Sequence, residues 1–362
     1  MHQRKLKITN IQTPRGNDRY EVNEKCFSDG FGRFWRELEE FCGFANEAKA
    51  CFEALHRAYV LSKPFSVNPT NLYREKKDDG TTCTQADCAC QFLIASEILK
   101  QFPNDSVFGE ESIESMSPTM ASIVNGLLPD DFDRGPILQK TVKHLGNEEE
   151  RVWVIDPIDG TSGFMNRGHY VHAICLMCGT TPTFSAMLWP LHTAELTGVP
   201  IKGPAFFMAA KGIGAFAVSL RKRVIKLKHC NNPVQAFTYP RSQVKQFAPM
   251  IEAMGSSDDS ICITSMAKGI ILGCGGATVY VRIAQEDPEH VWDIAPFELF
   301  LEELAVHRSY STGESFGYTT EGRLTKPLTL VFTSKDQNYH RLVCQFSFQL
   351  QNKPHCGIIK RK

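Results

Sequence analysis

The stretch from Trp153 to Thr161 constrains this chain more than any other part of its sequence. Its apolar first half is typical of a buried strand, and it leads into Asp156 and Asp159 and then into a Gly-Thr turn where a helix can begin. Two ionised carboxylates that are held close together either have a raised pKa or share cations. Oxygen-rich sites of this kind suit hard divalent ions such as Mg²⁺. The stretch therefore predicts a strand that ends in a metal site.

The composition excludes several classes of partner. The chain has 362 residues, enough for one large domain or two closely packed ones. Lysine plus arginine and aspartate plus glutamate both number 40, so no overall charge attracts a nucleic acid polymer or an anionic membrane. No stretch reaches membrane-spanning length without charges, and the basic segment Met1 to Asn10 is not followed by the apolar core of a secretory signal. We therefore expect a cytoplasmic protein that attracts any anionic ligand locally.

The cysteines favour reduced thiols over disulfides. There are thirteen, an odd number in a chain without a recognisable secretory signal. Two groups have spacings that suggest zinc, namely Cys83 with Cys88 and Cys90, and Cys175 with Cys178. No second Cys pair or His pair completes four ligands for either group, so burial as small apolar side chains is the better interpretation.

The apolar pattern predicts helices layered on sheets. Helices are predicted over residues 41–61, 88–100, 242–254, 266–273 and 292–305. Strands are predicted at residues 106–108, 170–177, 183–188, 205–209 and 277–283. The run 205–220 is interrupted by a glycine turn and is typical of a hairpin, whereas 116–150 resembles an irregular surface loop.

Acidic residues stand at the ends of several of these elements. Taken singly, Asp79 is explained as a turn former, Glu110 as part of a solvated face and Asp293 as a helix cap. Asp156 and Asp159 resist such an explanation, because paired acids at the end of a buried strand have no obvious structural use.

Three motifs follow one another along the chain. They are Gly109-Glu110-Glu111-Ser112, Asp156-Pro157-Ile158-Asp159-Gly160-Thr161 and Trp292-Asp293-Ile294-Ala295. In these motifs and their order the chain resembles the inositol monophosphatase superfamily of Mg²⁺-dependent, lithium-sensitive phosphatases. Their joint occurrence is far more specific than any single motif.

Within that superfamily the chain is most similar to the 3′(2′),5′-bisphosphate nucleotidases. Asp79 precedes Asp87 at the spacing of that family. Ser265, Lys268 and Arg282 stand where those enzymes hold the second phosphate of the nucleotide. A lysine and an arginine near a metal site also supply the fixed cationic donors that a second phosphate requires.

The resemblance implies a fold of mixed α+β and α/β type, the five-layer αβαβα sandwich of inositol monophosphatase and fructose-1,6-bisphosphatase. Residues 1–200 would form an N-terminal α+β part with most metal ligands. Residues 201–362 would form a C-terminal α/β part with Asp293 and the substrate-binding Ser265, Lys268 and Arg282. The site would lie between the two parts of a monomer or homodimer.

The resemblance also implies two to three Mg²⁺ ions and inhibition by Li⁺. The first ion would be held by Glu110, Asp156 and the backbone carbonyl of Ile158. The second would be held by Asp156, Asp159 and Asp293, and a third, weaker ion is expected beside Glu110 and Asp79.

The same resemblance assigns the groups that act on the phosphate. Thr161, with Asp79 or Asp87 as its acidic partner, would orient a water for in-line attack. The backbone N–H groups of Gly160 and Thr161 would face the scissile phosphate, and a side chain at Gly160 would keep that phosphate from the metals. Asp87 and Glu111 are expected to support these groups from behind.

The implied reaction is direct hydrolysis of the 3′-phosphate of adenosine 3′,5′-bisphosphate to AMP, with 3′-phosphoadenosine 5′-phosphosulfate as a further substrate. Three departures from the family pattern leave alternatives open. Ser162 replaces a lysine, Gln243 replaces a histidine, and Phe297 replaces a glycine and is expected to reshape the pocket wall. An inositol monophosphate or an inositol polyphosphate 1-phosphate is therefore the second substrate hypothesis, and a metal- or nucleotide-binding sensor with weakened turnover is the third.

Overall fold

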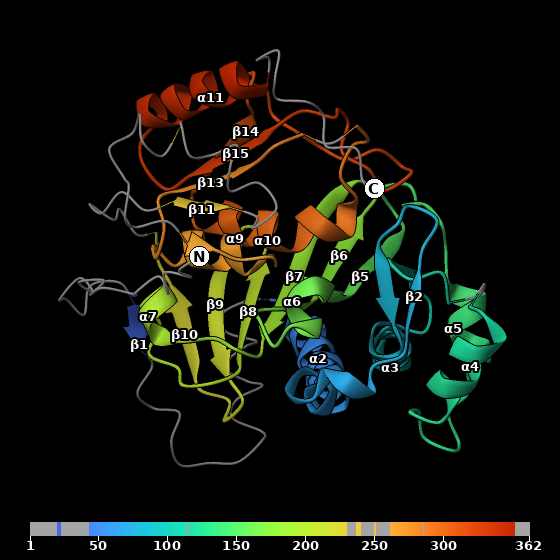
Figure 1. Cartoon of the computed structure of the whole chain (residues 1–362). Coiled ribbons are helices and arrows are strands. Elements are labelled where there is room, and N and C mark those ends of the chain that lie inside the picture. The colour runs from blue at the N-terminus through green and yellow to red at the C-terminus, as the bar shows by residue number, and fades with distance from the viewer. Residues whose placement is uncertain are drawn as a thin grey trace, which may run out of the picture.

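The computed structural model arranges the chain in five layers of helix and sheet (Figure 1). It describes residues 20–22, 43–113, 116–229, 237–239, 250, 261–284 and 286–351. Two outer helices cover a large sheet, two buried helices follow, and a smaller sheet is covered by one more helix. The helices of these layers are α2 (Ala45–Val67) with α3 (Gln85–Gln101), α9 (Ala267–Gly273) with α10 (Val291–Glu303), and α11 (Gln337–Gln351). The predicted αβαβα sandwich is therefore confirmed.

The large sheet has eight strands, of which only β4 and β5 run parallel as neighbours. In spatial order the strands are β1 (Tyr20–Val22), β10 (Val224–Leu227), β9 (Gly214–Ser219), β8 (Ala205–Ala210), β7 (Thr181–Trp189), β6 (Val171–Cys178), β5 (Arg151–Asp159) and β4 (Ser106–Gly109). The antiparallel strands and the hairpin predicted from the sequence are present. The sheet takes in strands on both sides of residue 200, and the division of the chain into two parts stays a prediction.

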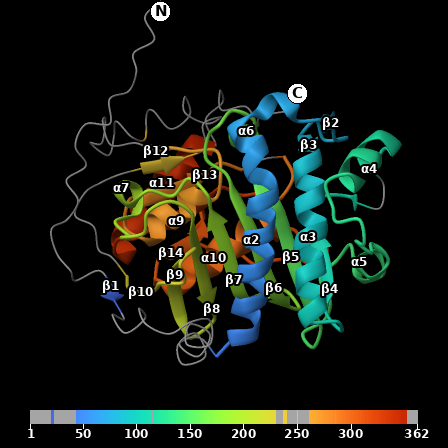
Figure 2. The same ribbon diagram turned by 90° about the horizontal axis from the view of Figure 1, so that it is seen from below.

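Helices α2 and α3 lie side by side across one face of this sheet (Figure 2). Their contact surface contains many small residues, among them Ala54, Ala58 and Ala89, all fully buried, which let the two helices approach closely. Helix α2 continues past Pro64, beyond the end predicted at residue 61. The other face of the sheet is covered as well, so β5 is buried on both sides and reads as a continuous apolar run.

The middle layer is formed by α9 and α10, which are apolar on nearly every side because sheets cover them above and below. Phe297 is fully buried here and lies against Gly269, where an added Cβ would come within 2.6 Å of the ring. Its ring also packs against Tyr280 and Phe332 of the second sheet. The expectation that Phe297 shapes a pocket wall is therefore wrong, because the residue fills the core between two layers.

The second sheet has five strands and is covered by α11. In spatial order they are β12 (Ile261–Cys262), β11 (Phe237–Tyr239), β13 (Val279–Arg282), β15 (Leu330–Thr333) and β14 (His307–Tyr310). Strand β13 leads from the core to the same edge at which α10 begins, so this sheet brings Arg282 close to Asp293.

The segment 116–150 differs from its prediction as an irregular loop. It contains α4 (Pro118–Asn125) and α5 (Gly135–Lys140), which pack beside α3 (Figure 2). Met120, Val124 and Ile137 are buried in the same core as α2 and α3. Helices this short span at most about two turns, so they leave no apolar period for sequence analysis to detect.

The remaining short elements lie around the edge of the large sheet. They are the 3₁₀ helix η3 (Pro69–Asn71), the hairpin β2 (Arg74–Lys76) with β3 (Thr82–Thr84), and the helices α6 (Thr161–Met165) and α7 (Ala194–Thr197). Among the described residues no helix combines the length and the apolar character needed to cross a bilayer. The helix predicted over 242–254, apart from residue 250, and the position of Gln243 lie outside the described residues.

Candidate metal centre

A β-bulge in β5 turns Asp156 and Asp159 toward the same side of the sheet. Residues three apart on a regular strand face opposite sides. In β5, however, Asp156 lies opposite Ala173 and Asp159 opposite Val171, so the strand carries one extra residue. Ile158 consequently packs on the α2–α3 side, and both carboxylates are directed toward the α10 side.

The bulge is held by a buried histidine. Pro157 has no N–H to donate to the ladder, and its carbonyl contacts Nδ1 of His172 on the neighbouring strand. Burial lowers the pKa of His172 to about 4, so the ring is neutral. Because a carbonyl only accepts hydrogen bonds, Nδ1 carries the proton, while Nε2 lies 3.0 Å from the Ser62 hydroxyl on α2.

Three carboxylates from two distant segments meet at this end of β5. Asp156, Asp159 and Asp293 each offer an oxygen that lies within 4.8 Å of the others. Asp293 stands in the first turn of α10, where the helix N-terminus favours negative charge. Oδ1 of Asp156 is buried and has no hydrogen-bond partner among the described residues. An orphaned, buried carboxylate oxygen beside two further carboxylates fits a hard divalent cation.

Glu110 joins this group because β4 and β5 are parallel. Their carboxyl ends meet at one edge of the sheet, and the backbone N–H of Glu110 donates to the carbonyl of Ile155 over 3.0 Å. The ammonium group of Lys77 lies 2.9 Å from the Glu110 carboxylate and 2.8 Å from that of Glu111. Glu110 therefore stands at the same end of the sheet as the three grouped carboxylates, and its charge acts on Asp156.

The electrostatics of the cluster favour a bound cation. Burial, then the neighbouring carboxylates, raises the pKa of Asp156 well above its ordinary range. Burial also raises the pKa of Asp159 to about 7, although Lys268 and Arg282 act in the opposite direction. The pKa of Glu110 is raised to about 7 by burial and by Glu111. Ionised carboxylates this close are therefore costly unless positive charge is added.

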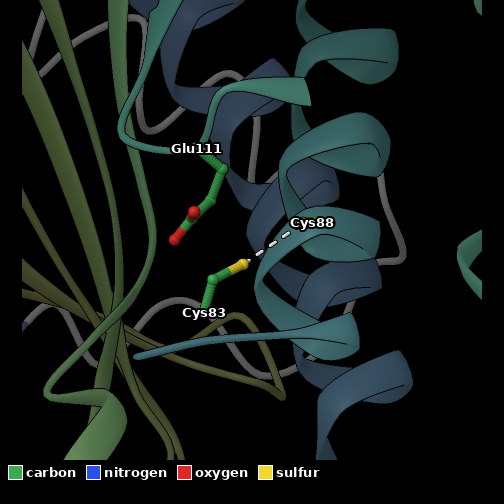
Figure 3. A group of neighbouring side chains, drawn as sticks. All are labelled: Cys83, Cys88 and Glu111. Carbon is green, nitrogen blue, oxygen red and sulfur yellow. Dashed lines mark hydrogen bonds between the residues drawn. The ribbon is translucent and has the colours of Figure 1, made fainter. Parts of the chain in front are cut away.

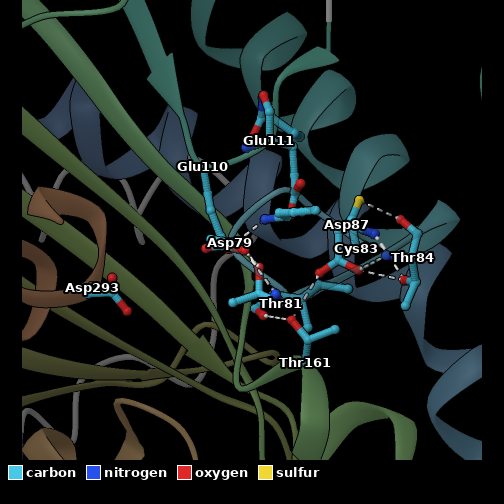
Figure 4. Close-up of polar contacts among 12 residues, drawn as sticks. Asp79, Thr81, Cys83, Thr84, Asp87, Glu110, Glu111, Thr161 and Asp293 are labelled. Atoms are coloured by element: carbon cyan, nitrogen blue, oxygen red, sulfur yellow. Dashed lines mark hydrogen bonds and ion pairs between the residues drawn. The ribbon is translucent and has the colours of Figure 1, made fainter. Parts of the chain in front are cut away.

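A second polar group adjoins the cluster and contains Thr161 (Figure 4). Its hydroxyl donates to the carbonyl of Ile158 over 3.2 Å and lies 3.4 Å from Oδ1 of Asp87. The other oxygen of Asp87 accepts from the backbone N–H of Thr84 at 2.8 Å and from its hydroxyl at 2.5 Å. The bond from the Thr84 N–H, together with the Asp87 N–H that donates to the Thr84 hydroxyl oxygen at 3.4 Å, forms the capping box at the start of α3. Burial raises the pKa of Asp87 to about 7.

Asp87, one of the two acidic partners considered for Thr161, lies within contact distance of its hydroxyl. Asp79 lies in the turn between β2 and β3, where its Oδ1 accepts from the backbone N–H and the hydroxyl of Thr81 at 2.8 and 2.6 Å (Figure 4). The hairpin therefore fixes the Asp79 carboxylate through its own turn.

The structure gives Gly160 a reason to be small in addition to the one expected. Its φ of +85° lies in the left-handed region, and a Cβ built there would lie 2.9 Å from Cβ of Ser265. The glycine thus allows the turn before α6 to pass against the segment before α9. The crowding comes from the protein itself, which the sequence analysis did not foresee.

The residues expected to hold a second phosphate lie next to the carboxylates. Nζ of Lys268 is buried and donates to the carbonyls of Ile263 and Ser265 at 3.2 and 2.5 Å. Burial lowers the pKa of Lys268 to about 8, against the attraction of Asp159. Lys268 and Arg282 thus both lie close enough for their charges to act on Asp159.

Arg282 is already engaged with carboxylates. Its guanidinium donates to both oxygens of Glu289 at 2.7 and 2.6 Å, and Nη2 lies 3.3 Å from Oδ1 of Asp293. Glu289 and Lys77 were not found by sequence analysis. Lys77 stands two residues before Asp79 in a polar turn, and nothing in that turn shows that it folds over Glu110.

Comparisons with known proteins identify the family of the chain. The family model described as the inositol monophosphatase family matches residues 37–350. A 3′(2′),5′-bisphosphate nucleotidase of Dictyostelium discoideum is 24% identical over 283 residues, which cover 72% of this chain and 85% of that protein.

Solved structures share the fold. An inositol monophosphatase of Thermotoga maritima superposes with a TM-score of 0.57 at 17% identity, covering 82% of this chain and 94% of that one. An inositol monophosphatase/NADP phosphatase complexed with Mg²⁺ and phosphate gives 0.51 at 14% identity, covering 79% and 90%. With most of its length matched by the family model, the chain belongs to the inositol monophosphatase family and is a phosphatase of that superfamily.

Proposed function

We propose that the chain is a Mg²⁺-dependent phosphomonoesterase that hydrolyses the 3′-phosphate of adenosine 3′,5′-bisphosphate to AMP, and that it also accepts 3′-phosphoadenosine 5′-phosphosulfate. The observation that carries this proposal is the meeting of Asp156, Asp159 and Asp293 within 4.8 Å, beside Lys268 and Arg282. The name of the Dictyostelium relative supports the choice of substrate.

In this proposal the carboxylates hold two to three Mg²⁺ ions. The ligands of the first are Glu110, Asp156 and the carbonyl of Ile158, those of the second are Asp156, Asp159 and Asp293, and a weaker third ion lies beside Glu110 and Asp79. When bound, Mg²⁺ supplies positive charge that lowers the pKa of water and stabilises the leaving oxygen. The proposal includes inhibition by Li⁺ and a cytoplasmic location.

The protein groups orient the attacking water. The Thr161 hydroxyl has one donor, and Asp87 and the Ile158 carbonyl both lie where they can accept it. The lone pairs of the hydroxyl are then available to a water on the side of the metal cluster. Asp87 is in turn held by Thr84, so its position does not depend on the substrate. The N–H groups of Gly160 and Thr161 bind the scissile phosphate.

Phosphate release from purified protein tests the reaction. We expect turnover of adenosine 3′,5′-bisphosphate that requires Mg²⁺ and falls on addition of Li⁺. If myo-inositol phosphates were turned over faster than the nucleotide, the inositol phosphate hypothesis would be preferred. Tight binding of the nucleotide without release of phosphate would instead identify a sensor.

The role of Lys268 has a sharper test. In the variant Lys268→Met the charge is lost while most of the apolar stem is kept. We expect the KM for adenosine 3′,5′-bisphosphate to rise by ~10-fold or more, the scale of one charge-assisted hydrogen bond. The KM for adenosine 3′-monophosphate, which has no second phosphate, should change much less. An equal change for both substrates would contradict the assignment.

A further inference from the structure

A second group of metal-ligating side chains lies behind the carboxylate cluster. Cys83 on β3, Cys88 on α3 and Glu111 after β4 each offer one atom that lies within 4.8 Å of the others. The two sulfur atoms are 3.3 Å apart. In Figure 3 the Glu111 carboxylate lies over the Cys83 thiol, which faces Cys88. The three side chains come from three separate segments of the chain, and each of them is buried.

The ligand chemistry of this group differs from that of the Asp156 cluster. Two thiols and one carboxylate suit a thiophilic divalent cation, whereas Mg²⁺ prefers oxygen ligands alone. We propose that Cys83, Cys88 and Glu111 form a binding site for a thiophilic divalent cation such as Zn²⁺ or Cd²⁺, separate from the Mg²⁺ centre. The site has three protein ligands and leaves a fourth position for water.

The geometry requires only a small adjustment. In a tetrahedral Zn²⁺ site with Zn–S bonds of about 2.3 Å, the two sulfur atoms lie about 3.8 Å apart. The observed separation of 3.3 Å would therefore have to widen by about half an ångström. The Glu111 oxygen lies within 4.8 Å of both sulfur atoms, so it is also close enough to approach the cation.

The charges are also largely balanced. On binding, the two thiols release their protons to solvent and become thiolates, and each donates an electron pair to the cation. Two thiolates and the Glu111 carboxylate then carry three negative charges. The divalent cation supplies two positive charges, and Lys77, which lies 2.8 Å from the Glu111 carboxylate and 2.9 Å from that of Glu110, offsets part of the third.

The spacing of the cysteines explains why the site was not predicted. Cys90 was grouped with Cys83 and Cys88 by sequence, but its thiol points to the carbonyl of Ala58 on α2. Positions 88 and 90 on a helix face different directions, so they cannot bind one cation. Glu111, 20 or more residues away along the chain, takes the third position instead.

Spectroscopy of the full chain tests the site directly. The reduced protein is titrated with Cd²⁺ in excess Mg²⁺, which occupies the oxygen cluster, and the cadmium–thiolate charge-transfer band is followed in the ultraviolet. We expect a band that saturates at one equivalent of Cd²⁺. Cys83→Ser and Cys88→Ser should each weaken Cd²⁺ binding by ~10-fold or more, and Glu111→Gln should weaken it while leaving the band.

Cys90→Ser is the matched control, since it removes a buried thiol from the same helix without touching the group. Circular dichroism shows whether each variant is folded, and Cys83→Ala and Cys88→Ala replace any serine variant that is not. The proposal is overturned if the band is absent from the reduced wild-type chain, if it survives in the folded double variant, or if Cys90→Ser abolishes it equally.

Discussion

Single side chains in the metal centre differ sharply in what they contribute. Asp156 offers a buried oxygen without a hydrogen-bond partner, whereas Asp159 accepts from the backbone N–H of Met266 and Asp293 contacts Arg282. These contacts hold the last two carboxylates in place from outside the cluster. Their charge should therefore be separable from their role in the fold.

We expect Asp159→Asn and Asp293→Asn each to lower Mg²⁺-dependent turnover by ~10²-fold or more, the scale for losing one electrostatic group at a reacting centre. Asparagine keeps the shape of the side chain, so circular dichroism should be unchanged. Phosphate release measured across Mg²⁺ concentrations checks this, with the exposed Asp130→Asn as control. Near-normal activity in both variants would contradict the site.

A substitution at Gly160 combines two costs, the positive φ of the backbone and the contact of the new side chain with Ser265. Alanine at this position must adopt a φ of +85° and place its Cβ 2.9 Å from that of Ser265. We expect Gly160→Ala to lower the free energy of unfolding by about 2 kcal/mol or more, measured by urea denaturation, and to reduce turnover.

Gly203 provides the matched control, because its φ of +79° is similar but an added Cβ meets nothing within 4 Å. Gly203→Ala should carry the cost of the positive φ alone, about 1 kcal/mol, with turnover preserved. Equal losses in the two variants would mean that the contact with Ser265 does not matter.

At the scale of elements, the start of α3 links helix stability to catalysis. Thr84 caps the helix, and its hydroxyl also holds the Asp87 carboxylate that faces Thr161. Thr84→Ala should therefore cost about 1 kcal/mol of stability and also lower kcat. Denaturation and steady-state kinetics on the same variant measure the two effects.

Ser117 is a comparable cap on α4, where it accepts from the backbone N–H of Met120 at 3.0 Å. Ser117→Ala should lose a similar amount of stability with kcat unchanged. A similar fall in kcat in both variants would show that the loss comes from destabilisation rather than from Asp87.

The elements that were predictable are those long enough to show a period. Helices α2, α3, α9 and α10 and strands β4 to β9 of the large sheet follow from apolar spacing, apart from shifts at their ends. Strands β1 and β10 of that sheet were not predicted. Helices α4 and α5 are too short for this, and their burial against α3 depends on the tertiary fold. The same limit hid Lys77 and Glu289, whose positions depend on a hairpin and a loop closing over distant carboxylates.

For the whole molecule, the layered order was predictable only through the three motifs and their resemblance to a family. Apolar spacing alone indicates helices on sheets without giving the number of layers. The acids at residues 110, 156, 159 and 293 could be assigned to one centre for the same reason. The proposed site at Cys83, Cys88 and Glu111 could not be predicted in this way. Its third ligand is a glutamate that sequence spacing does not connect to the two cysteines.

The carboxylate cluster joins the large sheet to α10, and Arg282 connects it to the second sheet, so the proposed cation binding should stabilise the entire fold in a pH-dependent way. Asp159 and Glu110 have pKa values of about 7 in the folded chain against ordinary values of 3.8 and 4.5. The folded, metal-free chain therefore keeps protons that the unfolded chain has lost. The contribution of these two carboxyl groups to the free energy of unfolding therefore falls as the pH rises from about 4 through about 7.

Added Mg²⁺ takes over the role of those protons. We expect it to raise the Tm more at about pH 8 than at about pH 5, with a gain of about 2.7 kcal/mol when its concentration is 100 times the Kd. Differential scanning fluorimetry measures this, and Asp159→Asn should show a smaller difference between the two pH values. A gain independent of pH would contradict the assigned pKa shifts.

The extra residue in β5 gives the centre an unusual vulnerability. Deleting either Pro157 or Ile158 would restore regular pairing with β6 and send Asp159 to the opposite face, toward α2, although every acid in the motif would still be present. The capacity to bind metal is thus encoded in a count of residues as much as in their identity. A length change of one residue would therefore separate the two carboxylates without replacing either of them.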